Sequence, residues 1–254
     1  ISVGTIKLII DSANSNYTMG YENLNANTAG SYNTAFGYRA LRTNDGSDNI
    51  AIGGYEPLYN NSGTDNIALG TATLFINRGS YNFGAGKEAL KRNSGSDNVA
   101  IGRTALYSNS GSDNIAIGRY AMQTARAGNN IALGPYALNA TSGGGYNVAL
   151  LEGALRANTG GGNVAIGQAV MNSNSGSYNF GVGYRSLYSN IGEYNIGFGY
   201  ESLYGNLGNY NFAVGRGSLY SNNGAYNQSL GYQAMGRNIG SYNLAMGYQS
   251  LFSN

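Results

Sequence analysis

Bulky and small residues alternate over three consecutive positions, and this triplet recurs along the chain. It reads Ile115-Ala116-Ile117 at one place, Val164-Ala165-Ile166 at another and Phe212-Ala213-Val214 at a third. An alternation with a period of two, carried by β-branched and aromatic residues, predicts a short β-strand. Neither face of this strand is polar, because the small residues between the bulky ones are also apolar.

An asparagine precedes each triplet and sets the period of the repeat, so we number every unit from this asparagine as position 0. It stands at Asn16, Asn33, Asn49, Asn66, Asn82, Asn98, Asn114, Asn130, Asn147, Asn163, Asn179, Asn195, Asn211, Asn227 and Asn243. The steps are 16 residues long, except three of 17. Repeats at a fixed period of this kind indicate a solenoid or an array, and here they predict about fifteen coils.

Other positions of the unit repeat as well. Position 4 is glycine, as in Gly102, Gly118, Gly134, Gly167, Gly183 and Gly199, and Leu151 breaks this column. Position 8 is leucine or methionine, position 11 is often a second asparagine, and position 13 is usually glycine. We expect a second short strand in the Y-x-A-L segment at positions 5–8. We expect turns at the position-4 glycine and in the segment at positions 11–14, which contains the second asparagine and the position-13 glycine, because asparagine and glycine tolerate positive φ.

Two short strands and two turns in sixteen residues predict one coil of an all-β parallel β-solenoid, or β-roll. Glycine and asparagine are poor helix formers, which argues against a helical repeat. Successive coils would hydrogen-bond at about 4.8 Å, so that equivalent residues stack. A structural ladder of side-chain amides is therefore expected, formed by residues that include Asn98, Asn114, Asn130, Asn163, Asn179 and Asn195.

The apolar character of both strand faces predicts self-association. A narrow roll buries only one face of each sheet, and soluble proteins rarely expose a continuous apolar stripe. Copies associating along the fibre axis would bury the other face, although the sequence does not indicate which apolar column faces a neighbour. The alternative is a wide monomeric solenoid that buries both faces within one chain.

Residues 1–15 do not fit the repeat, which covers residues 16–254. The segment TIKLII, residues 5–10, is expected to be a strand. A solenoid needs an atypical first element so that its first backbone edge is not exposed, so we expect a cap here. A junction to an upstream region is the alternative.

Composition narrows the chemistry. The chain has 254 residues, no histidine, no cysteine, a charged fraction of 10% and a net charge of +2. Without histidine or cysteine, the usual catalytic triads and the usual zinc sites cannot form. No cofactor is expected, no apolar run is long enough to span a membrane, and the basic residues are too sparse for a nucleic-acid stripe. The pair Lys91-Arg92 and the column of Arg103 and Arg119 are expected to be solvated.

The best acidic cluster stands at position 15, directly before the asparagine. It comprises Asp48, Asp65, Asp97 and Asp113, and neighbours one turn apart would repel each other. A cation site or an acid pair for glycan cleavage is one interpretation. We prefer the other, in which these are solvated turn residues that make Asx-type bonds to nearby amides, with no metal and no catalytic residue.

Tyrosine is the most informative residue type, with 23 copies. Position 15 becomes tyrosine in the second half of the chain, at Tyr178, Tyr194, Tyr210, Tyr226 and Tyr242. Positions 5 and 9 carry further columns, which include Tyr184 and Tyr200, and Tyr188, Tyr204 and Tyr220. Stacked rings of this kind could bind sugar rings, with the hydroxyl groups as hydrogen-bond partners. The alternative, which we favour, is an aromatic layer that shields the backbone.

The motif N-x-A-x-G-x-x-A, here Asn98–Gly102 followed by Ala105, resembles the head repeats of trimeric autotransporter adhesins of the YadA type. The longer phrase in residues 177–190 and 241–254 is similar to repeats in phage tail fibres and large bacterial surface proteins. The resemblance covers residues 16–254. It implies a left-handed parallel β-roll that forms a homotrimer, on a virion tail fibre or a bacterial cell surface.

These observations together predict a non-enzymatic structural and adhesive fibre, extracellular, with itself and surface glycans as candidate partners. The alternative is a glycan-binding or glycan-cleaving solenoid of the tailspike kind. An ice-binding solenoid would need a regular threonine array, whereas threonine occurs here irregularly, as at Thr34, Thr64, Thr104 and Thr159.

Overall fold

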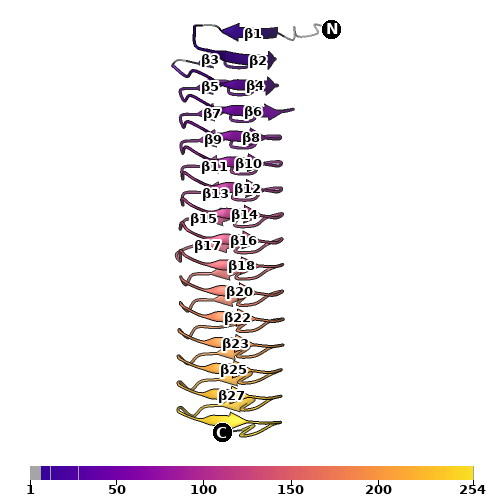
Figure 1. The fold of residues 1–254 in the computed structure, drawn as a ribbon, viewed down its shortest axis with the longest axis vertical. Coiled ribbons are helices and arrows are strands. Elements are labelled where there is room, and N and C mark those ends of the chain that lie inside the picture. The colour runs from indigo at the N-terminus through magenta and orange to yellow at the C-terminus, as the bar shows by residue number, and fades with distance from the viewer. Residues whose placement is uncertain (1–6, 12, 28, 254) are drawn as a thin grey trace. The chain divides into compact units, whose positions relative to one another are not determined.

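The structure is a computed structural model that describes residues 7–11, 13–27 and 29–253. Its regular elements are all β-strands, and the described residues contain no helix. The chain divides into two compact units, one up to Gly128 and one from Asn129. Both units are parallel β-solenoids, and together they contain about 14 turns (Figure 1). The expected all-β parallel solenoid is therefore confirmed.

In the first unit, each turn contributes one strand to a main sheet and one to a narrow sheet. The main-sheet strands are β2 (Asn16–Gly20), β4 (Thr34–Gly37), β6 (Ile50–Gly53), β8 (Ile67–Leu69), β10 (Phe83–Ala85), β12 (Val99–Ile101) and β14 (Ile115–Ile117). The narrow-sheet strands are β3 (Ala26–Asn27), β5 (Thr43–Asn44), β7 (Asn60–Asn61), β9 (Ile76–Asn77), β11 (Arg92–Asn93), β13 (Ser108–Asn109) and β15 (Thr124–Ala125). Pairing is parallel and in register by one repeat, so that Ala100 faces Ala116 and Asn93 faces Asn109.

The second unit repeats this arrangement, except in one turn. Its main-sheet strands are β16 (Ile131–Leu133), β18 (Val148–Leu150), β20 (Val164–Ile166), β22 (Phe180–Val182), β23 (Ile196–Phe198), β25 (Phe212–Val214), β27 (Gln228–Leu230) and β29 (Leu244–Met246). Its narrow-sheet strands are β17 (Ala140–Thr141), β19 (Ala157–Asn158), β21 (Ser173–Asn174), β24 (Gly205–Asn206), β26 (Ser221–Asn222) and β28 (Arg237–Asn238). The turn between β22 and β23, all of whose residues are described, has no narrow-sheet strand, so that β24, β26 and β28 form a sheet separate from β17, β19 and β21. The register is again one repeat, as in the pairing of Ala165 with Gly181.

A strand of different orientation precedes the repeats. Strand β1 (Lys7–Asp11) pairs antiparallel with β2, with Leu8 opposite Met19. This pairing covers the backbone edge of the first turn, which would otherwise be open to another chain. Residues 1–6 and 12, including the first two residues of the expected TIKLII strand, lie outside the described part of the chain.

The expected position of the second strand is wrong. Positions 5–8 form turns, and the strand lies at positions 10 and 11, so the turn expected to begin at position 11 begins after it. The reason is visible at Ala105 and Leu106, which are adjacent in the chain and both fully buried. A strand would point them to opposite faces. The chain instead turns at Leu106, whose φ is 48°, and both side chains point inward.

Each turn of the solenoid has corners made by residues in the left-handed region. In one turn these are Thr104, Leu106 and Asp113, with φ of 56°, 48° and 58°. A non-glycine residue in this region costs on the order of 1 kcal/mol or more. Hydrogen bonds between turns offset this cost, because the Leu106 N–H donates to the carbonyl of Ala121 at 3.0 Å and the Asp113 N–H to that of Ser96 at 3.1 Å.

The interior of the roll is narrow and filled. Position 2 supplies alanine or glycine in most turns, position 7 alanine or serine, and position 8 leucine or methionine. The largest fully buried side chains are Leu41, Leu58, Leu74, Leu90, Leu106, Met122, Leu138, Leu155, Met171, Leu187, Leu203 and Leu219. The bulky residues at positions 1 and 3 find no room inside and face outward. A wide solenoid that buries both strand faces within one chain is therefore not formed.

Candidate functional site

The asparagines at position 0 form a buried ladder that ties each turn to the next. Nδ2 of Asn98 donates to Oδ1 of Asn82 at 3.0 Å and to the carbonyl oxygen of Gly111 at 3.1 Å. Equivalent amide-to-amide bonds join Asn33 to Asn16, Asn49 to Asn33, Asn66 to Asn49, Asn82 to Asn66, Asn147 to Asn130, Asn179 to Asn163, Asn195 to Asn179, Asn211 to Asn195, Asn227 to Asn211 and Asn243 to Asn227. Backbone N–H groups also donate to this column. The N–H of Asn114, for example, donates to Oδ1 of Asn98 at 3.0 Å.

A second ladder runs through position 11 on the narrow sheet, which the sequence showed only as a recurring asparagine. Nδ2 of Asn93 donates to Oδ1 of Asn77 at 2.8 Å and to the carbonyl of Gly95 at 2.7 Å. In the first unit this column ends at Ala125, and in the second it begins with Thr141 and continues from Asn158. The two ladders satisfy buried backbone carbonyls at the corners, where no strand partner is available.

The glycine column at position 4 is required by geometry. Gly102 has a φ of 126°, and a Cβ there would lie 2.8 Å from the carbonyl carbon of Gly118. Five other glycines of this column also have a positive φ: Gly118 (135°), Gly134 (133°), Gly167 (135°), Gly183 (117°) and Gly199 (125°). Leu151, which replaces the glycine in one turn, adopts a φ of 82°. These ladder and glycine positions build the scaffold and leave its outer faces for function.

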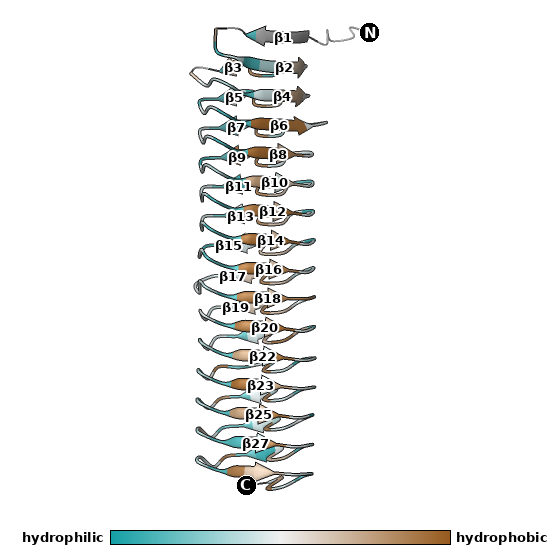
Figure 2. Cartoon of the chain, in the orientation of Figure 1, coloured by the Kyte–Doolittle hydropathy of each residue, from teal (hydrophilic) through white to brown (hydrophobic). Residues whose placement is uncertain are grey.

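The outer face of the main sheet is apolar. The outward-facing positions 1 and 3 carry isoleucine, valine, leucine or phenylalanine in most turns, and Figure 2 shows most of the main-sheet strands in brown or tan. Exposed members include Ile52 (43%), Ile101 (38%), Ile117 (39%), Leu133 (39%) and Ile196 (38%). The strip is interrupted at β27, which is teal in Figure 2 and carries Gln228.

The tyrosines at position 15 stack as a regular ladder along the second unit. The ring centroids of Tyr194 and Tyr210 lie 5.0 Å apart with an interplanar angle of 1°, and the pairs Tyr178–Tyr194, Tyr210–Tyr226 and Tyr226–Tyr242 lie 4.9–5.0 Å apart. Each inner ring therefore has both faces covered by its neighbours and presents its edge to solvent. Partial burial, with smaller contributions from neighbouring Tyr178 and Tyr210, raises the pKa of Tyr194.

Two further aromatic columns flank a hollow in the second unit. Tyr188, Tyr204 and Tyr220 stack at 5.0 and 4.9 Å in the position-9 column, which then reaches Gly236. In the position-5 column, the Arg216 guanidinium lies 5.0 Å from the ring centre of Tyr200 and 5.8 Å from that of Tyr232. A hollow of about 250 Å³ opens beside Gly236, and Glu201, Arg216 and Phe252 are among its lining residues.

The acidic column at position 15 does not form a site. Asp48, Asp65, Asp97 and Asp113 are exposed, and their carboxylates make no hydrogen bond to another described residue. The expected Asx-type bonds are therefore wrong, because the left-handed backbone turns these side chains outward into water. Within residues 7–11, 13–27 and 29–253, no three acidic side chains gather closely enough to hold a metal ion.

No protein-family model, curated protein or solved structure matches this chain. The similarity to YadA-type head repeats and tail-fibre repeats thus stays a prediction from the motifs. The described part of the chain also contains no helix long and apolar enough to cross a membrane.

Proposed function

We propose that this chain is a non-enzymatic structural and adhesive fibre element, extracellular, whose copies associate as a homotrimer through the outer face of the main sheet. The observation that carries the proposal is the outward apolar column pair at positions 1 and 3. The interior is already closed by fully buried residues such as Ala100 and Leu106, so the outward isoleucines cannot be accommodated inside. They need a partner surface from outside the chain.

A second copy of the same chain fits this surface best. The apolar side chains recur once per turn at the β-strand spacing of about 4.8 Å, and another copy in register offers the same spacing. In the second unit the six main-sheet strands from β16 to β25 extend the strip without interruption over about 24 Å, which is long for a surface that stays in water. Closed rotational symmetry is the usual arrangement for such self-complementary surfaces. The resemblance to YadA-type repeats supports three copies and a left-handed roll.

The chemistry of the chain supports a role without catalysis. Histidine and cysteine are missing from the sequence, so the side chains that could act as nucleophile, base or metal ligand are mainly twelve carboxylates, three lysines and the hydroxyl residues. The four stacked aspartates stand on separate turns and face solvent. What repeats from turn to turn is therefore shape and apolar surface, which suits a shaft or a head domain on a virion or a bacterial cell.

The test is a pair of charged substitutions on the outer face, Ile101→Lys with Ile117→Lys. We expect the particle mass to fall to that of one chain while the far-ultraviolet circular dichroism stays that of the β-solenoid. The matched control is Ser62→Lys with Ser175→Lys, which adds the same charge on the outside of the narrow-sheet side. If both double variants have the same mass as the parent, the main sheet is not the contact surface.

Glycan binding at the tyrosine ladder is a second candidate function, favoured by the row of exposed tyrosines from Tyr178 to Tyr242. Because the ring faces are occupied by neighbours, a glycan would contact ring edges and hydroxyl groups. Replacing Tyr194 and Tyr210 with alanine should abolish retention on a glycan array while the fold persists. Unchanged retention would mean that the tyrosine ladder contributes to the stability of the fold and does not bind glycans.

A further inference from the structure

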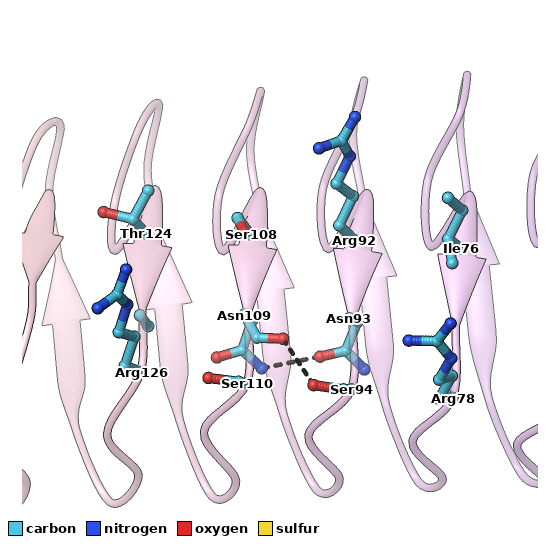
Figure 3. Close-up of a pocket in the computed structure, with 11 residues that line it drawn as sticks. Ile76, Arg78, Arg92, Asn93, Ser94, Ser108, Asn109, Ser110, Thr124 and Arg126 are labelled. Atoms are coloured by element: carbon cyan, nitrogen blue, oxygen red, sulfur yellow. Dashed lines mark hydrogen bonds between the residues drawn. The ribbon is translucent and has the colours of Figure 1, made fainter.

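A second hollow lies on the outer face of the narrow sheet in the first unit. It has a volume of about 480 Å³ and is lined by positions 10–12 of four consecutive turns, from strand β9 to strand β15 and the residues that follow them (Figure 3). Three arginines, Arg78, Arg92 and Arg126, surround it, and its lining includes no acidic residue and no aromatic residue. These arginines are up to 48 residues apart in the chain, and the stacking of turns brings them to one hollow.

The arginines are spaced along the solenoid by its repeat. Arg78 and Arg126 both occupy position 12, three turns apart, which at about 4.8 Å per turn separates their backbones by about 14 Å. Figure 3 shows them at opposite ends of the hollow with Ser94 and Ser110 between them. Arg92 occupies position 10, one turn from Arg78, on the other edge of the hollow.

The three guanidinium groups have no partner within the described residues. All three side chains are exposed, and none makes an ion pair, a hydrogen bond or a ring contact there. Two other basic residues of the same unit are paired with carboxylates: Arg39 with Glu22 at 2.8 Å and Lys91 with Glu88 at 2.7 Å. The hollow is therefore an uncompensated positive site in a chain whose net charge is only +2.

The floor of the hollow is held in place by the second asparagine ladder. Nδ2 of Asn109 donates to Oδ1 of Asn93 at 2.8 Å, and the Ser94 hydroxyl donates to the carbonyl of Asn109 at 3.5 Å (Figure 3). Both asparagines are buried, so the backbone beneath the arginines is fixed by bonds between turns. A rigid floor reduces the conformational entropy lost when a ligand binds.

We propose that this hollow binds an anionic polysaccharide, whose carboxylate or sulfate groups pair with Arg78, Arg92 and Arg126. Guanidinium groups bind such planar or branched oxyanions through paired N–H donors. The hydroxyl groups of Ser94, Ser110 and Thr124 supply neutral hydrogen-bond partners between the charges, which suits sugar hydroxyls. Single-stranded nucleic acid fits less well, because its bases stack on aromatic side chains and none lines the hollow.

The inference rests on the adhesive role proposed above and gives it a ligand class. The hollow lies on the narrow sheet, whereas the apolar strip lies on the main sheet, whose positions 1 and 3 point out of the opposite side of the roll. Association through the main sheet would therefore leave the hollow open. Because all its lining residues belong to one chain, binding and association can be measured separately.

The test compares binding of the intact chain to four immobilised probes at fixed salt: dextran sulfate, polygalacturonate, unmodified dextran and oligo-dT. The variant is Arg78→Gln with Arg126→Gln. The charge-matched control is Lys87→Gln with Arg103→Gln, two exposed basic residues in the position-5 column outside the hollow. The particle mass of every variant is measured in the same buffer, so that loss of association is distinguished from loss of binding.

We expect dextran sulfate, polygalacturonate or both to bind and unmodified dextran not to bind. The two anionic probes distinguish sulfate from carboxylate ligands. The hollow variant should lose at least tenfold in affinity at unchanged mass, and the control less than twofold. If the hollow variant and the control lost the same affinity, binding would depend only on the overall charge of the chain, and the proposal would be overturned. Absence of binding to both anionic polysaccharides, or tighter and arginine-dependent binding of oligo-dT, would also overturn it.

Discussion

Nδ2 of Asn98 lies 3.0 Å from Oδ1 of Asn82, sixteen residues earlier, and the backbone N–H of Asn98 donates to the same oxygen at 3.1 Å. Both side chains are buried, with exposed fractions of 0% and 2%. The Asn82 side chain thus accepts two bonds from the next turn, and Nδ2 of Asn98 also donates to the carbonyl of Gly111. This link, repeated along each unit, holds the corner between the two sheets.

Replacing Asn98 with alanine should therefore be destabilising. The change leaves the N–H of Asn114 buried without its side-chain partner, whereas the carbonyl of Gly111 keeps its bond from Nδ2 of Asn109. An unsatisfied buried group of this kind costs about 1–3 kcal/mol, so we expect a loss of about 1–3 kcal/mol. Urea unfolding followed by circular dichroism measures it. Asn223→Ala is the control, because that asparagine is exposed and should change stability by less than about 0.5 kcal/mol.

The position-4 glycines predict a contrast between two alanine substitutions. Gly102→Ala places a Cβ 2.8 Å from the carbonyl carbon of Gly118 at a φ of 126°, so it should lower the free energy of unfolding by more than about 2 kcal/mol. Gly54→Ala adds a Cβ with no atom within 4 Å and should be neutral or slightly stabilising. Thermal unfolding of both variants checks this. Equal changes in stability in the two variants would contradict the close approach of neighbouring turns at the position-4 column.

The left-handed corner at position 15 predicts a stabilising substitution. Asp113 has a φ of 58° and stacks one turn from Asp97, so Asp113→Asn removes a repulsion and introduces a residue that tolerates this conformation. The chain already uses such residues in this column, with Asn129 at 60° and Gly162 at 68°. We expect a gain of about 0.5–1 kcal/mol by denaturant unfolding. Asp113→Ala removes the same charge, but alanine does not tolerate the left-handed conformation as asparagine does. If Asp113→Ala raised the free energy of unfolding as much as Asp113→Asn, the preference of this corner for asparagine would be contradicted.

The tyrosine ladder predicts a loss of stability at high pH. The pKa of Tyr194 is raised above its ordinary value of about 10, first by partial burial and then by neighbouring Tyr178 and Tyr210. A group whose pKa is raised by folding stabilises the fold below its unfolded pKa, and this stabilisation is lost as the pH rises through the folded pKa. Titration of phenolate absorbance should therefore show late ionisation in the parent. Tyr194→Phe should lose less stability than the parent above pH of about 10, and an identical pH profile would contradict this.

The regular features of the fold could be predicted because each has a local signature. The period, the strand at positions 1–3 and the stacked asparagines follow from the recurrence of Asn98 and its equivalents before an alternating triplet. The second strand could not be placed, because Ala105 and Leu106 are consecutive apolar residues that favour an extended segment. Their joint burial depends on the left-handed φ of Leu106, and leucine carries no sequence signal for that conformation.

The candidate sites differ in the same way. The tyrosine columns were visible in the sequence, whereas the covering of each ring face by its neighbour required the 5.0 Å spacing of Tyr194 and Tyr210. The hollow on the narrow sheet was missed, because Arg92 was expected to be a solvated residue without a role. Arg78 and Arg126 come close to Arg92 only because the turns of the solenoid stack. Writing the sequence in columns of equal position is the signal that would have grouped them.

The mass of the particle in solution shows whether other copies of the chain cover the outward isoleucines of the main sheet. Light scattering coupled to size-exclusion chromatography on the parent chain measures this mass without any probe or substitution. We expect a single species of three times the 26.6 kDa chain mass. A folded, monodisperse species of 26.6 kDa that keeps its β-solenoid circular dichroism would contradict it.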